Sequence, residues 1–270
     1  MGRLPGHRPL IMGILNVTPD SFYDGGRFLR KEDAVAHALK MVEEGADIVD
    51  VGGESTRPFS SPTPAEDELK RVIPVIEEIR RRTEVLISID TYKAEVAKRA
   101  IEAGAGMIND ISGLTFDEGM VGVARHFDGP VVVMHTKGRP ADMQRDPHYD
   151  DVVEEISRFF EERLNTLEGE GIERDRIILD PGIGFGKRAE DNMRILKHLE
   201  KFKVFGRPLL VGTSMKSFIG AVTDSPLEER LPGTLASVVL AFLCGADIFR
   251  VHNVKATYKA LRFVESFMRA

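Results

Sequence analysis

Short apolar runs alternate along the chain with longer amphipathic segments. The short runs are rich in Val, Ile and Leu and do not alternate with polar residues, which is typical of strands buried on both faces. Eight runs have this character, namely "LIMGIL", "DIVDVGG", "VLISID", "GMIND", "PVVVMHT", "RIILDPG", "PLLVGTS" and "DIFRVHN". Because strands that alternate with helices form parallel βαβ units, the pattern predicts an α/β protein with a parallel sheet.

The segments between these runs have helical periodicity. "KEDAVAHALKMVEEG", which ends at Gly45, carries one apolar face. That face comprises Ala34, Val35, Ala38, Leu39 and Val42. In "SPTPAEDELKRVIPVIEEIRRR", Thr63 and Glu66 flank Pro64 in a capping-box pattern that predicts a helix start. Asp150 is the predicted start of the helix that contains "DVVEEISRFFEERL".

About eight strand–helix units follow one another without a Pro/Ser-rich linker or a shift in composition. We therefore predict a single (β/α)8 barrel over residues 1–270, with its active site at the C-terminal ends of the strands. The 270 residues, 42% of them hydrophobic, suffice for one large core, although two smaller domains are also within reach. An open doubly wound sheet is the alternative, but it more often has fewer strands and a Gly-rich first turn, and "GILNVTP" is not such a turn.

The composition narrows the class of partner. The net charge of -6 gives no basic footprint for nucleic acid or an anionic membrane. No apolar run approaches the ~20 residues of a membrane span, and "MGRLPGHRPL" lacks the apolar core of a signal peptide. We expect a soluble cytoplasmic protein with no nucleic-acid or membrane partner. The single cysteine, Cys244, lies in the apolar run "LASVVLAFLCGA" and is expected to be a core residue.

Nearly every apolar run is followed by polar or charged residues. In run order these are Asn16; Thr56 and Arg57; Asp90; Asn109 and Asp110; His135, after Met134; Asp180; Ser214, Lys216 and Ser217; and Arg250, His252 and Asn253. A single one of them, such as Asp90 before "TYKAEV", could simply cap a helix. Capping does not explain the full set, because in a barrel all of these positions meet at one rim.

The set has two chemical halves. One half can hold anions: Arg57, Lys216, Arg250, His252 and the backbone amides of "GGEST" and "GTS". The other half offers the acceptors and the amide of Asp90, Asn109 and Asp180, with apolar neighbours such as Met134, Ile111 and Phe185. Carboxylates that accept N–H protons between apolar faces are suited to a flat, nitrogen-rich heterocycle.

Other chemistries fit the sequence poorly. "GIGFGK" is not a phosphate-binding P-loop, because Pro181 and Arg188 stand where Gly and Ser or Thr belong. His135 and His252 have neither zinc-site spacing nor a cysteine cluster. No G-x-S-x-G nucleophile motif is present. "HTKGRPADMQ" by itself favours a solvated basic loop.

Taken together, these segments resemble the dihydropteroate synthase family of folate biosynthesis. The matching motifs run in the family's order over nearly the whole chain: "NVTPDSFYDGG", "DVGGESTRP", "SIDTYK", "INDISG", "VVVMHTKGRPADMQ", "LDPGIGFGK", "GTSMKSFIG" and "FRVHNV". The resemblance implies a (β/α)8 barrel that joins 6-hydroxymethyl-7,8-dihydropterin diphosphate to p-aminobenzoate and releases pyrophosphate. It also implies a homodimer formed through helices late in the barrel.

The resemblance further implies a role for individual residues. The implied pterin contacts are Asp90, Asn109, Ile111, Met134, Asp180, Phe185, Gly212, Lys216 and Arg250. The implied diphosphate contacts are Asn16, Thr56, Arg57, Arg250 and His252, with Mg2+ expected near Asn16. The implied p-aminobenzoate contacts are Phe22, Pro58, Lys216 and Ser217. Asp90, Asp180, Lys216 and Arg57 are the implied catalytic residues.

Three positions depart from the family's usual pattern. Met215 stands where Arg is usual, Asn253 where Asp is usual, and Tyr23 where Ser is usual. We expect the loop after the first strand, residues 18–26, to be a lid with Gly25 and Gly26 as its hinge, and Phe22 to close over p-aminobenzoate.

Three alternative functions remain open from the sequence. A pterin-dependent methyltransferase of the same fold should not need "NVTPDSF" and "ESTRP". The same reaction with a modified aminobenzene acceptor is excluded less firmly. A non-catalytic scaffold barrel is disfavoured, because the anion-binding and carboxylate groups are all present.

Overall fold

The computed structural model describes residues 8–18 and 31–270, and in this part of the chain eight parallel strands alternate with helices. The strands are β1 (Leu10–Asn16), β2 (Ile48–Gly52), β3 (Leu86–Asp90), β4 (Met107–Asp110), β5 (Val131–Met134), β6 (Ile177–Asp180), β7 (Leu210–Val211) and β8 (Ile248–Val251). Each falls within one of the eight apolar runs, except that β1 extends one residue further to Asn16, so the predicted order of strands is confirmed.

The strands form a nearly closed barrel. Hydrogen-bonded neighbours follow the order β6-β5-β4-β3-β2-β1-β8-β7, so that the first and last strands lie side by side. The two edges meet at an isolated parallel bridge between Leu179 and Leu209, beside which the Leu179 amide donates to the Pro208 carbonyl at 2.9 Å. Sequential strand order with β8 beside β1 confirms the (β/α)8 barrel and rules out the doubly wound alternative.

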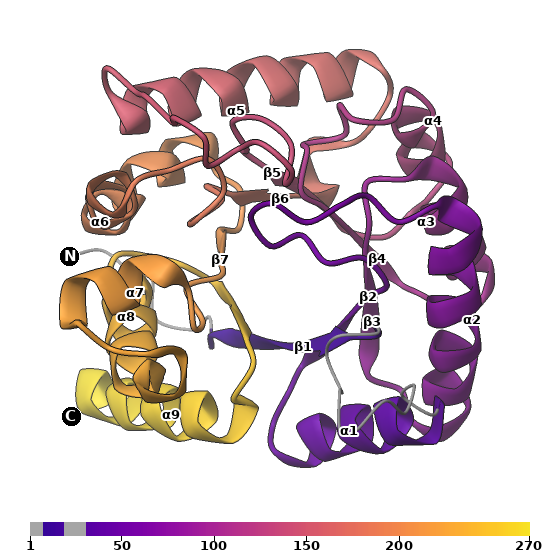
Figure 1. Ribbon diagram of the computed structural model, residues 1–270, viewed down its shortest axis with the longest axis horizontal. Coiled ribbons are helices and arrows are strands. Elements are labelled where there is room, and N and C mark those ends of the chain that lie inside the picture. Colours follow the sequence, from indigo (N-terminus) through magenta and orange to yellow (C-terminus); the bar gives the residue numbers. More distant parts are fainter. Residues whose placement is uncertain (1–7, 19–30) are drawn as a thin grey trace.

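The helices form an outer ring around the strands (Figure 1). They are α1 (Lys31–Glu43), α2 (Ala65–Arg82), α3 (Ala94–Glu102), α4 (Met120–Arg125), α5 (Val152–Gly169), α6 (Ala189–Lys197), α7 (Ser217–Thr223), α8 (Leu231–Leu243) and α9 (Val254–Arg269). Short 3-10 turns occupy Arg174–Arg176, Leu199–Phe205 and Leu227–Glu229. None of the described helices combines the length and the apolar character that a bilayer crossing requires.

The apolar runs lack alternation because the two faces of each strand enter two different cores. In β6, Ile177 and Leu179 face the helices and belong to the large outer core, whereas Ile178 belongs to a core made of strand residues alone. That inner core fills the base of the barrel with Met12, Ile48, Met107, Val132, Ile178, Leu210 and Ile248. Side chains two residues further along each strand share the same face, so they point into the barrel at its C-terminal end.

Two predicted helix starts are wrong by one residue. Helix α2 begins after Pro64 without a side-chain cap, because the Thr63 amide instead donates to Glu54 Oε2 at 2.9 Å. Helix α5 is capped by Asp151, not Asp150, and its carboxylate accepts from the Val153 amide at 3.0 Å.

Two packing predictions also need adjustment. In α1 the fully buried face includes Met41, whereas Leu39 and Val42 are only half-buried. Cys244 is half-buried at the end of α8, and burial raises the pKa of its thiol.

Candidate active site

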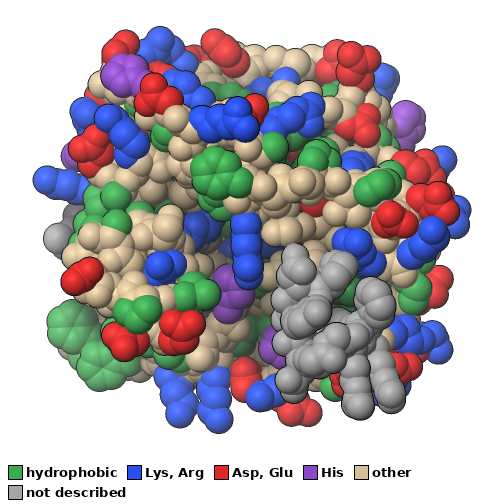
Figure 2. All heavy atoms as spheres, viewed as in Figure 1, with side chains coloured by type: hydrophobic (Ala, Val, Ile, Leu, Met, Phe, Trp, Pro, Cys, Tyr) green, Lys and Arg blue, Asp and Glu red, His purple; other side chains and the backbone are tan. Residues whose placement is uncertain are grey.

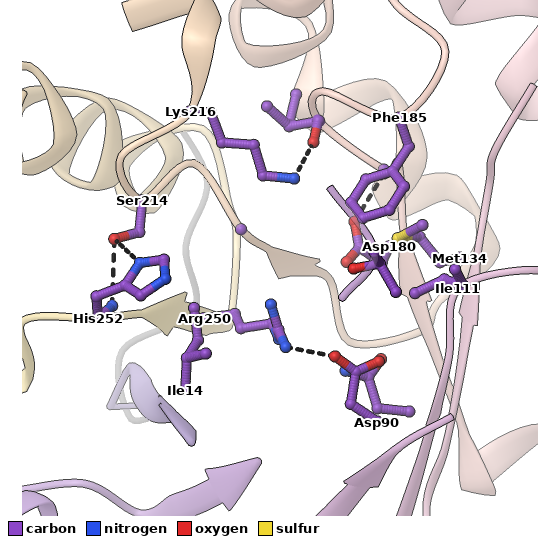
Figure 3. Close-up of a pocket in the computed structure, with 15 residues that line it drawn as sticks. Ile14, Asp90, Ile111, Met134, Asp180, Phe185, Ser214, Lys216, Arg250 and His252 are labelled. Atoms are coloured by element: carbon purple, nitrogen blue, oxygen red, sulfur yellow. Dashed lines mark hydrogen bonds and ion pairs between the residues drawn. The ribbon is translucent and has the colours of Figure 1, made fainter. Parts of the chain in front are cut away.

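A cavity opens at the C-terminal ends of the strands. Figure 3 shows the side chains that line it, and Figure 2 shows Lys, Arg and His side chains around the hollow centre of one face of the molecule. The sequence analysis predicted most of the lining: Thr56, Asp90, Asn109, Ile111, Met134, Asp180, Phe185, Gly212, Lys216, Arg250 and His252. Ile14, Gly182, Ile183 and Ser214 complete it.

Arg250 is the central cation of this cavity. Its side chain lies on the inward face of β8, two residues after Ile248 of the inner core. Arg250 Nε donates to Asp50 Oδ2 at 2.7 Å, and Nη2 donates to Asp90 Oδ2 at 2.6 Å. Both carboxylates are buried and close to the guanidinium, so their charges raise the pKa of Arg250 and keep it cationic despite its burial.

Asp50 is a site residue that the sequence analysis missed. It is fully buried within β2, and its Oδ2 also accepts from Asn109 Nδ2 at 3.1 Å. Because the amide nitrogen of Asn109 is used in this way, its carbonyl oxygen is the atom left for the cavity. The signal was available in principle, since a charged residue two places after the inward Ile48 must face the barrel interior.

Asp90 has an unsatisfied acceptor within the wall of the cavity. Its Oδ1 is buried and has no hydrogen-bond partner among the described residues, although its Oδ2 is paired with Arg250. Burial raises the pKa of Asp90 to about 7, and the positive charge of Arg250 opposes that rise. A buried acceptor without a donor is costly, so this oxygen is suited to a ligand that brings an N–H group.

Asp180 and Lys216 are two further polar residues of the cavity wall. Asp180 Oδ1 accepts from the Gly182 amide at 2.7 Å, and Lys216 Nζ donates to the Ile183 carbonyl at 2.6 Å. Burial raises the pKa of Asp180 to about 6, whereas burial lowers the pKa of Lys216 to about 7, with Asp180 opposing.

The space between these polar walls is bounded by an apolar cluster. Ile111, Met134, Met143 and Phe185 pack together as a small core of their own. Lys216 Nζ lies 4.1 Å from the centre of the Phe185 ring. Met143 belongs to the basic loop after β5. The sequence predicted a solvated loop, and this prediction is wrong for Met143. This residue supports the floor of the cavity.

The glycines after β6 let that loop lie directly against the loop after β5. Gly182 has φ +68°, and a Cβ there would be 1.9 Å from the His135 carbonyl oxygen. Gly186 has φ +62°, and a Cβ there would be 2.3 Å from the Lys137 carbonyl oxygen. Only glycine fits at these two positions, because a side chain would collide with the neighbouring backbone.

His135 does not reach the cavity. It is buried behind the loop after β6, where Lys187 Nζ contacts His135 Nδ1 at 3.0 Å and donates to the Phe185 carbonyl at 3.0 Å. Burial, followed by the charge of Lys187, lowers the pKa of His135 well below its ordinary value. His135 and Lys187 therefore fasten the two loops to each other.

His252 stands at the rim of the cavity beside Ser214. The His252 amide donates to Ser214 Oγ at 3.2 Å, and Ser214 Oγ lies 3.0 Å from His252 Nδ1. Loss of water around the ring and the charges of Arg250, Lys216 and Arg57 lower the pKa of His252 to about 4. His252 is neutral at pH 7 and can donate one N–H to an anion.

The family model described as pterin binding enzyme matches residues 12–252. Dihydropteroate synthase of Escherichia coli K12 is 48% identical over 262 residues, which cover 97% of this chain and 93% of that protein. The chain belongs to the dihydropteroate synthase family.

Solved structures of this family have the same architecture. Dihydropteroate synthase of Xanthomonas albilineans with 4-aminobenzoic acid is 46% identical, has a TM-score of 0.92, and covers 97% of this chain and 94% of its own. The same enzyme in complex with 7,8-dihydropteroate is 44% identical, has a TM-score of 0.89, and covers 97% and 95%.

Some residues that the family resemblance implicated do not line the cavity. Asn16 is half-buried at the end of β1, and Arg57, Pro58 and Ser217 are exposed on the surrounding loops. Phe22 and the rest of the predicted lid, from residue 19 to residue 26, lie outside the described residues, as does Tyr23. The roles assigned to these residues stay predictions.

The other two departures from the family's usual pattern have structural roles. Met215 adopts φ +60°, its amide donates to Thr234 Oγ1 at 3.0 Å, and its sulfur contacts the same hydroxyl. Asn253 is the N-cap of α9, and its side chain accepts from the Ala256 amide at 3.0 Å. Neither residue is part of the cavity lining, which is consistent with an intact site.

Proposed function

We propose that this chain is a working dihydropteroate synthase, which joins 6-hydroxymethyl-7,8-dihydropterin diphosphate to p-aminobenzoate and releases pyrophosphate. The observation that carries the proposal is the unsatisfied Asp90 Oδ1 beside an apolar slot whose rim is cationic. Family membership supports the same reaction.

The pterin ring would lie between Phe185 and the Arg250 side chain, against Met134 and Ile111. Asp90 and Asp180 would accept ring and amino protons, Asn109 would offer its carbonyl oxygen, and Lys216 would donate to a ring acceptor. Acceptors of the protein thus face donors of the pterin, and the Lys216 donor faces a pterin acceptor.

The diphosphate would lie at the rim. Thr56, Arg57 and neutral His252 would donate to its oxygens, and Arg250 would add positive charge. Asn16 would offer an amide oxygen to Mg2+. No cluster of three His, Cys, Asp or Glu side chains suited to a metal occurs among the residues that the structure describes. A single amide oxygen from Asn16 fits Mg2+, because this ion commonly takes few protein ligands and is held largely by substrate phosphates and water.

The proposed chemical step is a dissociative, SN1-like displacement. The bond between the exocyclic methylene carbon and the diphosphate oxygen breaks, and the oxygen leaves with both electrons. Bound Mg2+ would supply charge neutralisation for the diphosphate. The methylene cation is conjugated with the dihydropterin ring, and ionised Asp90 and Asp180 favour it. The arylamine nitrogen then attacks the carbon and loses a proton to water.

The p-aminobenzoate would bind over the methylene group. Pro58, Lys216 and Ser217 would contact it from the loops after β2 and β7, and Phe22 would cover it from the loop after β1. Excluding water at this stage protects a reactive cation from hydrolysis.

One assay tests the proposed function against its alternatives. Purified protein is mixed with pterin diphosphate, Mg2+ and p-aminobenzoate, and dihydropteroate and pyrophosphate are both measured. Equal yields of the two products support the proposal, and their absence overturns it. Parallel reactions with a methyl-folate donor plus a corrinoid acceptor, and with a ribosylated aminobenzene, distinguish the methyltransferase and modified-acceptor alternatives.

Pterin binding should strengthen as the pH rises from 6 to 7.5. Asp90 must be ionised to accept a pterin proton, and its pKa is about 7 in the free protein. Its ionised fraction therefore rises from roughly a tenth to roughly three quarters over this interval, which lowers Kd about eightfold. Calorimetry with 6-hydroxymethylpterin in buffers of different ionisation enthalpy measures both the affinity and the protons released. An unchanged Kd, or a slope that persists in Asp90→Asn, contradicts the assignment.

We also propose that two copies associate through the faces of α8 and α9. Large apolar side chains are exposed there: Leu240, Leu243, Phe263, Phe267 and Met268. Figure 2 shows apolar side chains gathered over the C-terminal end of α9. A patch of this kind is typical of a protein interface. A cytoplasmic location is part of the proposal and is supported by Cys244, which has no second cysteine for a disulfide.

A charge in this patch should dissociate the dimer. The double variant Phe263→Glu/Phe267→Glu places two carboxylates in the apolar contact, so light scattering should report the mass of one chain in place of two. Lys98→Glu, on an exposed position of α3, is the control and should leave the mass unchanged. A wild-type mass of one chain would refute the dimer.

A further inference from the structure

Glu54 is a buried carboxylate that the proposed mechanism does not use. It lies in the loop after β2 and does not line the cavity. Only 8% of its surface is exposed, and its side chain has three partners. Glu54 Oε1 accepts from the Tyr92 hydroxyl at 2.8 Å, and Oε2 accepts from the Thr63 amide at 2.9 Å and from Lys93 Nζ. This is an unusually complete set of donors for a carboxylate in a connecting loop.

The partners of Glu54 close the loop that carries Thr56, Arg57 and Pro58. Glu54 is at the beginning of this loop and Thr63 is at its end, so their hydrogen bond ties the two ends together. The three residues between them, which we assign to the diphosphate and to p-aminobenzoate, are half-buried or exposed. Their position therefore depends on how the ends of the loop are held.

Contacts within the loop and from its tip transmit this constraint. Ser60 Oγ contacts the Ser55 carbonyl at 2.6 Å and the Arg57 carbonyl at 2.8 Å. The Phe59 amide donates to the Pro140 carbonyl at 2.8 Å, which joins the tip to the loop after β5. Phe59 adopts φ +65°, a strained conformation for a residue other than glycine. A loop fixed at its base and its tip can hold this conformation.

Lys93 fixes Glu54 to the rigid part of the barrel. It lies three residues after Asp90, at the start of α3, and its Nζ is shared by Glu54 and Glu68. The exposed side-chain fractions of Lys93, Glu54 and Glu68 are 15%, 6% and 0%. An exposed ion pair would hold little, but these three side chains are buried, and loss of Lys93 would leave two carboxylates without a counter-ion.

We propose that Glu54 is the positioning residue for the loop that binds the diphosphate. It acts through Arg57 and Thr56 and does not touch the substrate. This inference rests on the proposed function, because the loop is assigned to the diphosphate of the pterin substrate. It adds a specific consequence: Glu54 sets the preference for a diphosphorylated pterin over the same pterin without its diphosphate.

The decisive variant is Glu54→Gln, which keeps the shape of the side chain but removes its charge. A glutamine carbonyl cannot replace both carboxylate oxygens toward Tyr92, Thr63 and Lys93. Catalytic loops misplaced by about 1 Å commonly lose activity by about 100-fold. We expect kcat/KM for pterin diphosphate to fall by about 10-fold to 100-fold, while Kd for 6-hydroxymethylpterin changes by less than about twofold. Glu66→Gln, an exposed carboxylate on α2, is the matched control and should behave as wild type.

A double-mutant cycle tests the route through Arg57. If Glu54 acts by positioning Arg57, then Glu54→Gln should have little further effect in an Arg57→Ala background. A purely structural role predicts a lower active fraction, equal losses for both pterins and the same loss in both backgrounds. Equal losses for both pterins would overturn the proposal, and so would the same loss in both backgrounds.

Tyr92→Phe removes a single hydrogen bond and serves if Glu54→Gln does not fold. It should shift the preference for the diphosphate in the same direction and by a smaller factor, and an unchanged preference counts against the proposal. Failure of the proposed function is distinguishable, because then wild-type protein itself forms no dihydropteroate.

Discussion

Replacing Arg250 with methionine is expected to lower the free energy of unfolding by about 3–5 kcal/mol at pH 8 and to abolish pterin binding. Arg250 is the counter-ion of Asp50 and Asp90, whose side chains are 0% and 7% exposed. Removing one partner of a buried ion pair leaves an uncompensated charge, which is much more costly than the intact pair was worth. Two carboxylates are affected here by one substitution.

The loss should depend on pH in a defined direction. Asp90 has a folded pKa of about 7 against an ordinary value of 3.8, so the folded state binds more protons between these values. Its ionisation therefore lowers stability as the pH rises from about 4 to about 7. Without Arg250 the folded pKa of Asp90 rises further, and the destabilising interval extends above pH 7.

Urea denaturation of wild type and variant at pH 5.5 and pH 8 measures this difference. The deficit should be smaller at pH 5.5, where Asp90 is protonated in both proteins and loses no ion pair, than at pH 8, where the loss of the Asp90 ion pair adds to that of Asp50. Arg250→Lys keeps one charge and is the matched control, with a smaller deficit at pH 8. The same deficit at both pH values would show that packing of the arginine stem, and not its charge, explains the loss.

The sequence predicts the barrel well because its strands are buried on both faces. In β6, Ile177, Ile178 and Leu179 all enter apolar cores, so the run has no alternation and reads clearly as a buried strand. Strand β7 has only Leu210 and Val211 in its ladder, and the barrel is closed beside it by one isolated bridge. Closure is a property of the whole sheet, and no local pattern specifies it.

The cavity was predictable to the extent that side-chain parity along the strands determines it. Asp90, Asn109, Asp180 and Arg250 occupy the last inward positions of their strands, directly above the inner core. Asp50 obeys the same parity but lies one step deeper, inside an apolar run, and was overlooked for that reason. Its partner Arg250 is 200 residues away in sequence, so the pair could not be recognised from spacing.

The error at the start of α2 has a physical origin in a tertiary contact. Thr63 has the residue type and spacing of an N-cap, but Glu54 offers its amide a buried carboxylate. A tertiary hydrogen bond to Glu54 therefore replaces local capping. Glu54 is also the residue that we propose to position the loop. The misassigned cap was thus an indirect indication of Glu54.

Arg57→Ala should lower kcat more than it raises KM for p-aminobenzoate. Arg57 is expected to neutralise the diphosphate as the carbon–oxygen bond breaks, so its effect belongs to the transition state and not to arylamine binding. Removing one such donor commonly lowers kcat by about 100-fold to 1000-fold. Arg57→Lys keeps the charge but loses bidentate contact and should fall between the variant and wild type. Arg139→Ala, an exposed arginine that packs on Phe116, is the control.

Rapid-mixing single-turnover measurements with arylamines of different basicity complete the test. In a dissociative step the leaving group is mostly gone before the amine attacks, so the rate of wild-type chemistry should vary little with arylamine basicity. Arg57→Ala should lower this rate by the same factor for every arylamine, because the amine takes no part in breaking the carbon–oxygen bond. A steep dependence on basicity would place the amine in the rate-limiting transition state. An unchanged kcat in Arg57→Ala would remove Arg57 from the mechanism. It would also remove the reason for Glu54 to position the loop that carries Arg57.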